Sequence, residues 1–260
     1  MTRPVFVKTD NLIQMTDRQE ISFSGDDITD DQLYALAQNA DLRTLVIWGG
    51  PLRNERLAPL ARLSQLQGLV LGEMAIDDGV FQYLKTLRQL EYLNLAYTNV
   101  TGDFTALEGL PLRDVRLEGC RRVGDRCAQT LAGFPTLRQV EIHMTNLTDA
   151  GVQHLAGLPL EVLWLGGRIT DRGMSVVGNI PTLKHLDVCS PGVTDRGVQA
   201  ISGLNGLEIL WLSQCTITDA SVNQLGKFQS LRELAVGKTG ITAAGEARLR
   251  ELLPECRLVD

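Results

Sequence analysis

Three residues whose side chains can do chemistry alternate along one short segment: His185, Asp187 and Cys189. If the segment is a strand, residues two apart point to the same face, so the three side chains share one surface. A histidine beside a cysteine suggests nucleophilic catalysis, and all three side chains can bind metal ions. Their alpha carbons would however be about 6.6 Å apart along the strand, and no flanking ligand set accompanies them. We therefore predict no catalytic residue and no metal site, and keep an enzyme that uses this strand as an alternative.

A regular series of aspartates is a second candidate for metal binding. Its members are Asp125, Asp149, Asp171, Asp195 and Asp219. All but the first follow a threonine, a pair that favours the start of a helix: the hydroxyl caps a free amide, and the carboxylate meets the positive end of the helix. Capping accounts for the series without calcium. The pair Gly166 and Gly167 lacks the lysine and serine of a phosphate-binding loop, so we predict no cofactor.

The elements that position these side chains follow from a leucine that returns nine times, about 22 to 25 residues apart. The nine units begin at Leu42, Leu66, Leu90, Leu112, Leu137, Leu160, Leu183, Leu207 and Leu231. Each begins an L-x-x-[LV]-x-[LIV] run, in which positions 3, 5 and 7 alternate with the apolar positions 4 and 6. This period of two predicts a strand with one buried face, and the fixed repeat length predicts a solenoid. We expect Leu93, Leu95, Leu163, Leu165, Leu210 and Leu212 in its core.

A second signal follows about eleven residues into most units, as in Ile169-Thr-Asp-Arg-Gly173. The predicted N-caps of the helices are Thr148, Thr170, Thr194 and Thr218. Parallel strands stack about 4.8 Å apart, whereas helices need about twice that spacing, so the helices must lie on the outside of a curved stack. The sequence predicts about ten strands along the inner side of a horseshoe.

These repeats resemble the leucine-rich-repeat family, and within it the cysteine-containing and ribonuclease-inhibitor-like subtypes. The Ile/Val-Thr-Asp-x-Gly step is similar to that of F-box-type and bacterial repeat arrays, and the resemblance covers about residues 18 to 260. It implies an α/β fold: a right-handed solenoid with a parallel sheet on the concave face and helices on the convex face. The cysteine that follows the strand in these subtypes is present only at Cys120 and Cys215. No F-box precedes the repeats, so the resemblance implies protein recognition but no ubiquitin-ligase role.

One continuous domain is expected. Residues 1–41 would form an N-terminal cap with one degenerate repeat, residues 42–230 the repeats, and residues 231–260 the last repeat and a C-terminal cap. The unit from Leu90 to Pro111 contains Gly102 and Gly109, which predict a short helix or a 3₁₀ turn.

The overall composition limits the classes of partner and the cellular location that we expect. The net charge of −6 disfavours nucleic acid or an anionic membrane as the main partner. Met1–Thr9 lacks the apolar run of a signal peptide, and no stretch approaches the length of a membrane span. Five scattered cysteines fit reduced thiols, so we expect a cytoplasmic monomer, with secretion by a route without a cleaved signal as an alternative.

The tryptophans indicate where a partner binds, because all three fall on positions predicted to face away from the core. Trp164 and Trp211 occupy position 5 of their units with Asp187 between them, and Trp48 occupies position 7. Exposed indoles are favoured anchors of protein interfaces. We predict a site centred on Trp164, Asp187 and Trp211, which the strand alternation should expose. Its other predicted residues are Trp48, His143, His185, Glu141, Arg116 and Gln214. In the alternative interpretation each indole only packs on its neighbours, and Arg116–Glu141 and Glu118–His143 are local charge pairs.

The sequence thus predicts a non-enzymatic protein that binds a protein partner on its concave face, as an inhibitor or an immunity-type protein. A bacterial effector or scaffold that acts on a host or cellular protein is one alternative, and a repeat array without a specific partner is another.

Overall fold

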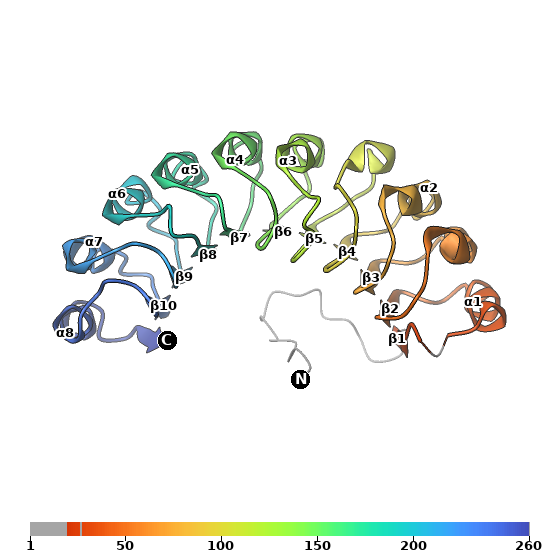
Figure 1. Cartoon of the computed structure of the whole chain (residues 1–260), viewed down its shortest axis with the longest axis horizontal. Helices are drawn as coiled ribbons and strands as arrows, with labels where there is room; N and C mark the ends of the chain where they lie inside the picture. Colours follow the sequence, from red (N-terminus) through yellow and green to blue (C-terminus); the bar gives the residue numbers. More distant parts are fainter. Residues whose placement is uncertain (1–19, 27, 260) are drawn as a thin grey trace.

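The computed structural model describes residues 20–26 and 28–259. In this part of the chain eleven strands form one sheet in chain order, and each strand pairs in parallel with the next. Figure 1 shows the strands along the inner side of an arch and the helices along its outer side. The predicted parallel sheet inside a helical layer is confirmed, with eleven strands instead of about ten. The segment before Glu20 that was assigned to the N-terminal cap lies outside the described residues.

The strands are short and evenly spaced. They are β1 Glu20–Ser24, β2 Thr44–Trp48, β3 Gly68–Gly72, β4 Tyr92–Asn94, β5 Asp114–Arg116, β6 Gln139–Glu141, β7 Val162–Gly166, β8 His185–Cys189, β9 Ile209–Trp211, β10 Glu233–Ala235 and β11 Arg257–Val259. Every register is one unit of the leucine frame, so a given position in one repeat pairs with the same position in the next. Leu163, for example, pairs with Leu186, and Leu186 pairs with Leu210.

The outer layer changes along the arch. Its α-helices are α1 Asp30–Leu36, α2 Phe81–Leu84, α3 Asp125–Leu131, α4 Asp149–Leu155, α5 Asp171–Val177, α6 Asp195–Ala200, α7 Val222–Leu225 and α8 Ala243–Leu252. Its 3₁₀ helices are η1 Asn54–Arg62, η2 Asp78–Val80, η3 Phe104–Leu107 and η4 Asp219–Ser221. The unit from Leu90 to Pro111 carries only η3, as its glycines predict.

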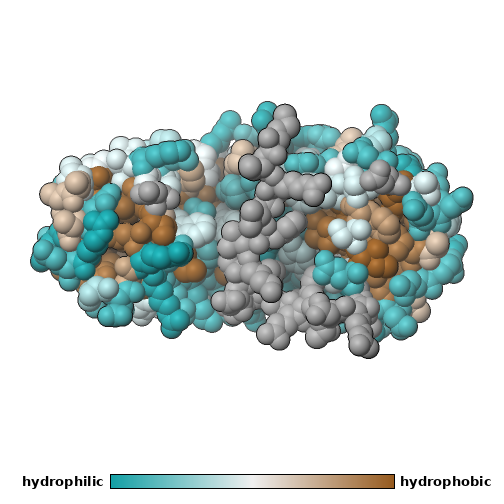
Figure 2. Space-filling view, turned by 90° about the horizontal axis from the view of Figure 1, so that it is seen from below, coloured by the Kyte–Doolittle hydropathy of each residue, from teal (hydrophilic) through white to brown (hydrophobic). Residues whose placement is uncertain are grey.

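The core is a continuous column of apolar side chains between the sheet and the outer layer, running from Ile28 to Leu253. The six leucines predicted to be core, among them Leu93, Leu163 and Leu210, are fully buried. Figure 2 shows apolar colour at both ends of the arch. Half-buried Phe23 at one end and Leu258 at the other pack against the core there.

The Thr-Asp step joins neighbouring repeats as well as capping helices. The Thr170 hydroxyl accepts from the backbone amide of Arg172, as predicted for an N-cap. The amide and hydroxyl of Thr170 also donate to the two carboxylate oxygens of Asp149 in the preceding repeat, at 2.8 and 2.6 Å. A Cβ on Gly173 would lie 2.4 Å from that carboxylate, which is why this position is a glycine. These contacts fix one repeat against the next and thereby hold the strands of the concave face in register.

No helix among the described residues is long and apolar enough to cross a membrane.

Candidate binding site on the concave sheet

The site begins with one row of side chains across the inner face of the sheet. Trp164 on β7 pairs with Asp187 on β8, and Asp187 pairs with Trp211 on β9. On the other side of Trp164, the row continues through Glu141 on β6 to Arg116 on β5. The predicted row is therefore confirmed residue by residue, because parallel stacking of equal repeats leaves no other register.

The two indoles of this row converge. Their strands are two steps apart, about 10 Å, yet the ring centroids of Trp164 and Trp211 lie 6.2 Å apart. The His185 ring contacts both, with centroids 5.5 Å from Trp164 and 5.0 Å from Trp211. His143 extends the group, with its ring 6.0 Å from that of Trp164. We call Trp164, Trp211, His185 and His143 the ring cluster.

The prediction that strand alternation exposes the three central residues of the site was wrong. Trp164, Asp187 and Trp211 are half-buried instead of exposed, and the two indole rings lie against each other. Glu141 and His185 are almost completely buried, at 4% and 5% exposure. These two residues therefore line the floor of the site and present little contact area to a partner.

The ring cluster holds unpaired polar atoms. In the described part of the chain, three buried side-chain nitrogens lack a hydrogen-bond partner: His143 Nδ1, Trp164 Nε1 and His185 Nε2. All three belong to the ring cluster. Trp211 differs, since its Nε1 donates to Glu233 Oε1 at 2.8 Å. Buried polar groups normally have partners, so their concentration at one place marks the site apart from the rest of the sheet.

A chain of charge pairs adjoins the ring cluster. Arg116 lies 3.0 Å from Asp114 and 3.8 Å from Glu141, and His143 Nε2 lies 3.1 Å from Glu118. The predicted pairs Arg116–Glu141 and Glu118–His143 are thus present.

Burial controls the protonation of these groups. It raises the pKa of Glu141 to about 7 against the opposing charge of Arg116. Burial also disfavours the charged form of His143, but the hydrogen bond to Glu118 and the nearby carboxylates outweigh it and raise the pKa of His143. Glu118, Glu141 and His143 bring ligand atoms within 4.8 Å of one another, and the charge pairs account for that proximity.

Asp187 has no such partner. No hydrogen bond or ion pair to its carboxylate is formed by any described residue, and burial raises its pKa to about 6. The charge of His143 lowers this pKa, but by less than burial raises it. The carboxylate is thus partly desolvated and forms no ion pair with a described residue.

His185, Asp187 and Cys189 alternate on β8 as predicted. Burial lowers the pKa of His185 to about 4 and raises that of the Cys189 thiol, which the charge of Asp187 raises further. A thiol nucleophile needs a lowered pKa, so both shifts run against the alternative of an enzyme.

The remaining predicted site residues lie away from the ring cluster. Trp48 is on β2, five strands before β7, and Gln214 is exposed in the turn after β9 with a φ of 64°. The sequence analysis missed Glu233, the acceptor for Trp211. Its position on β10 opposite Ile209 on β9 places it diagonally beside Trp211, so the repeat frame contained that signal.

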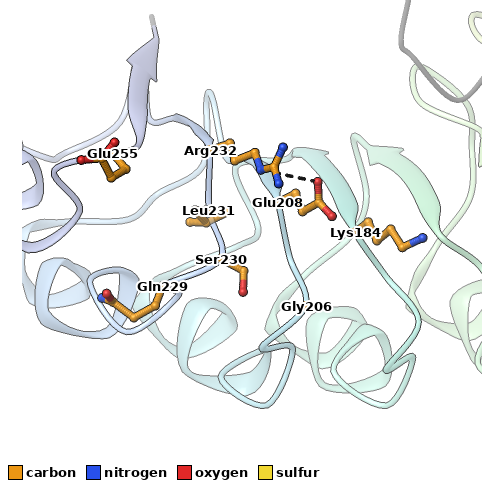
Figure 3. A pocket seen from close by; sticks show the side chains of 8 residues that line it. All are labelled: Lys184, Gly206, Glu208, Gln229, Ser230, Leu231, Arg232 and Glu255. Carbon is orange, nitrogen blue, oxygen red and sulfur yellow. Dashed lines mark ion pairs between the residues drawn. The ribbon is translucent and has the colours of Figure 1, made fainter.

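An open hollow of about 570 Å³ lies outside the concave face, where the chain enters β8, β9 and β10 (Figure 3). Lys184 on its wall pairs with Glu161 at 2.7 Å, and Arg232 lies 3.9 Å from Glu208. Because three of the four charged side chains that line it already form these pairs, we do not assign this hollow a ligand.

A family model described as leucine rich repeat matches residues 179–202, the stretch that leads into and includes β8. The chain has the fold of a leucine-rich-repeat solenoid. Two solved structures of Listeria monocytogenes proteins share the fold of this solenoid. An internalin, InlF, has a TM-score of 0.61 and 16% identity, covering 93% of this chain and 82% of its own. Internalin C2 has a TM-score of 0.51 and 20% identity, covering 89% of this chain and 84% of its own. No curated protein matches the solenoid.

Proposed function

We propose that the solenoid is a non-enzymatic module that binds a protein partner on its concave face, with Trp164, Asp187 and Trp211 at the centre. The observation that carries the proposal is the coincidence in one place of two half-buried indoles and a carboxylate to which no described residue forms a hydrogen bond or ion pair, beside ring nitrogens without a hydrogen bond. Interface centres combine aromatic anchors with polar groups that a partner satisfies.

The structural role of the solenoid in binding is to hold this surface rigidly. The Thr-Asp hydrogen bonds join each repeat to the next and keep the sheet rigid, so little conformational entropy is lost when a partner docks. We further propose that the protein acts as a monomeric inhibitor or immunity-type protein that covers a partner molecule. The five described cysteines are free thiols, in keeping with a reducing, cytoplasmic setting. An effector or scaffold would use the same surface on a different partner.

The test compares partner capture by two matched proteins. The native protein and a Trp164→Ala/Trp211→Ala variant are used as baits in extracts of the source organism, and the captured protein is then purified and its Kd measured. We expect each single Trp→Ala change to weaken binding by about 2 kcal/mol or more. A Gln153→Ala variant, altered on the exposed side of α4, is the control and should bind like the native protein. Equal affinity of the double variant, shown folded by its melting curve, would place the binding surface elsewhere.

A further inference from the structure

The buried and half-buried carboxylates of the inner face differ in whether another side chain forms a hydrogen bond or an ion pair with them. Asp114 and Glu141 pair with Arg116, Glu118 pairs with His143, and Glu233 accepts from Trp211 and pairs with Arg257. Asp187 alone among them has neither a hydrogen bond nor an ion pair from any described residue. A desolvated carboxylate without a partner lowers the stability of a protein. The group is therefore suited to a cation that the described residues do not supply.

The surroundings of Asp187 fit a flat organic cation better than a metal ion. Two indoles flank it in the same row, and indole faces attract cations through the ring quadrupole. Guanidinium groups stack on aromatic rings and pair with carboxylates through two parallel hydrogen bonds. The site offers one carboxylate and no second unpaired oxygen ligand, whereas hard metal ions take several oxygen ligands.

The excess of carboxylates on this part of the sheet also favours a positively charged partner group. From β5 to β8 the inner face carries four carboxylates, those of Asp114, Glu118, Glu141 and Asp187, against the guanidinium of Arg116 and the imidazole of His143, whose pKa is raised. An acidic surface steers a basic segment toward it and disfavours an acidic one.

We propose that the partner presents an arginine whose guanidinium group stacks on the indoles of Trp164 and Trp211 and pairs with Asp187. This inference rests on the proposed function, since it names the chemistry of the residue that the same site receives. The arginine supplies a counter-charge that no described residue supplies through an ion pair.

The test uses a short peptide, so it does not need the natural partner. Acetyl-Gly-Arg-Gly-amide is titrated into the ¹⁵N-labelled full-length protein, and the three indole N–H signals are followed by NMR. We expect saturable shifts for Trp164 and Trp211 and none for Trp48, which lies on β2. The neutral analogue with citrulline in place of arginine should bind at least tenfold more weakly.

Two variants separate the charge of Asp187 from general electrostatics. Asp187→Asn should weaken arginine-peptide binding at least tenfold, whereas Glu251→Gln, which removes an exposed carboxylate on α8, should leave it unchanged. Three outcomes would overturn the proposal: no saturable shift, equal binding of the citrulline peptide, or unchanged binding by Asp187→Asn. A lysine peptide that binds as tightly as the arginine peptide would overturn the choice of a guanidinium group.

The two proposals fail in different ways. If the double tryptophan variant loses the partner while Asp187→Asn keeps it, the concave site stands and the arginine assignment is wrong. If the arginine peptide binds in an Asp187-dependent way while the purified partner binds equally well to the double tryptophan variant, the proposed function is wrong and the cation site stands.

Discussion

The carboxylate of Asp149 accepts both the backbone amide and the hydroxyl of Thr170, one repeat further along the chain. The same two bonds join Asp78 to Thr101, Asp125 to Thr148, Asp171 to Thr194, Asp195 to Thr218 and Asp219 to Thr242. Each aspartate begins or precedes the helix of its own repeat, while its oxygens bond to the cap of the next. The series is therefore a structural ladder between repeats.

Loss of one Asp–Thr contact between repeats should measurably lower the free energy of unfolding. Asp149→Ala leaves the Thr170 amide and hydroxyl without their acceptor, so we expect the free energy of unfolding in urea to fall by about 1–3 kcal/mol. Thr170→Ala removes the cap and the hydroxyl bond to Asp149 but keeps the amide bond, and it should cost at least as much as a cap alone, about 0.5–2 kcal/mol. A change within about 0.5 kcal/mol, the range of ordinary surface substitutions, would show that the ladder does not stabilise the fold.

The glycine beside each rung should be equally sensitive. Gly173→Ala would place a Cβ 2.4 Å from Asp149 Oδ1 and 2.9 Å from Ile169 Cγ2, so we expect a loss of about 1–3 kcal/mol. Gly157→Ala is the matched control, because its Cβ would meet no atom within 4 Å. Thermal unfolding of the two variants should differ clearly, and equal melting temperatures would refute the close approach at Gly173.

Calcium should not bind the ladder. Both oxygens of each aspartate already accept hydrogen bonds from the next threonine, as at Asp171 with 2.7 Å for each contact. Titration with calcium should leave the melting temperature unchanged. A saturable rise would mean that the ion displaces these bonds, and the series would then be a metal site.

The two indoles should respond differently to the same conservative change. Trp211→Phe removes the hydrogen bond to Glu233 and should destabilise the protein by about 1–2 kcal/mol. Trp164→Phe removes a donor that has no acceptor, so the free protein should be as stable as before or slightly more stable. Trp164→Phe should nevertheless bind the partner more weakly. If it lowers stability as much as Trp211→Phe, Trp164 Nε1 has a partner in solution.

Asp187 should make stability depend on pH. Its pKa of about 6 in the folded protein exceeds the ordinary value of about 3.9. The folded state therefore holds the proton more tightly, and stability falls as pH rises from about 4 to above 6. Asp187→Asn should be more stable than the native protein by on the order of 1–3 kcal/mol at pH 7.5.

The advantage of Asp187→Asn should shrink toward zero near pH 4, which urea unfolding at several pH values would reveal. His185 titrates in a range that overlaps that of Asp187, because burial lowers the pKa of His185 to about 4. His185 therefore destabilises the folded state as pH falls. This contribution is present in both proteins and largely cancels in their difference. A stability difference that does not vary with pH would show that Asp187 is not desolvated.

The sequence by itself determined the repeat, the strand alternation and the row that contains Trp164, Asp187 and Trp211. These follow from local periodicity: once every unit has the same length and buries the same leucines, each position must stack on its equivalent in the next unit. The fully buried Leu163 and Leu210 are consequences of the same rule.

Only the tertiary structure decided how the side chains of that row use the space above the sheet. The convergence of the two indoles, the burial of His185 against both and the lack of a partner for Asp187 among the described residues depend on side-chain torsions and on neighbours about 22 to 25 residues away in sequence. The Asp149–Thr170 contact is likewise invisible within one repeat, since its two halves belong to adjacent units. Periodicity specifies which backbones meet, whereas the pairing and exposure of polar side chains depend on packing between repeats.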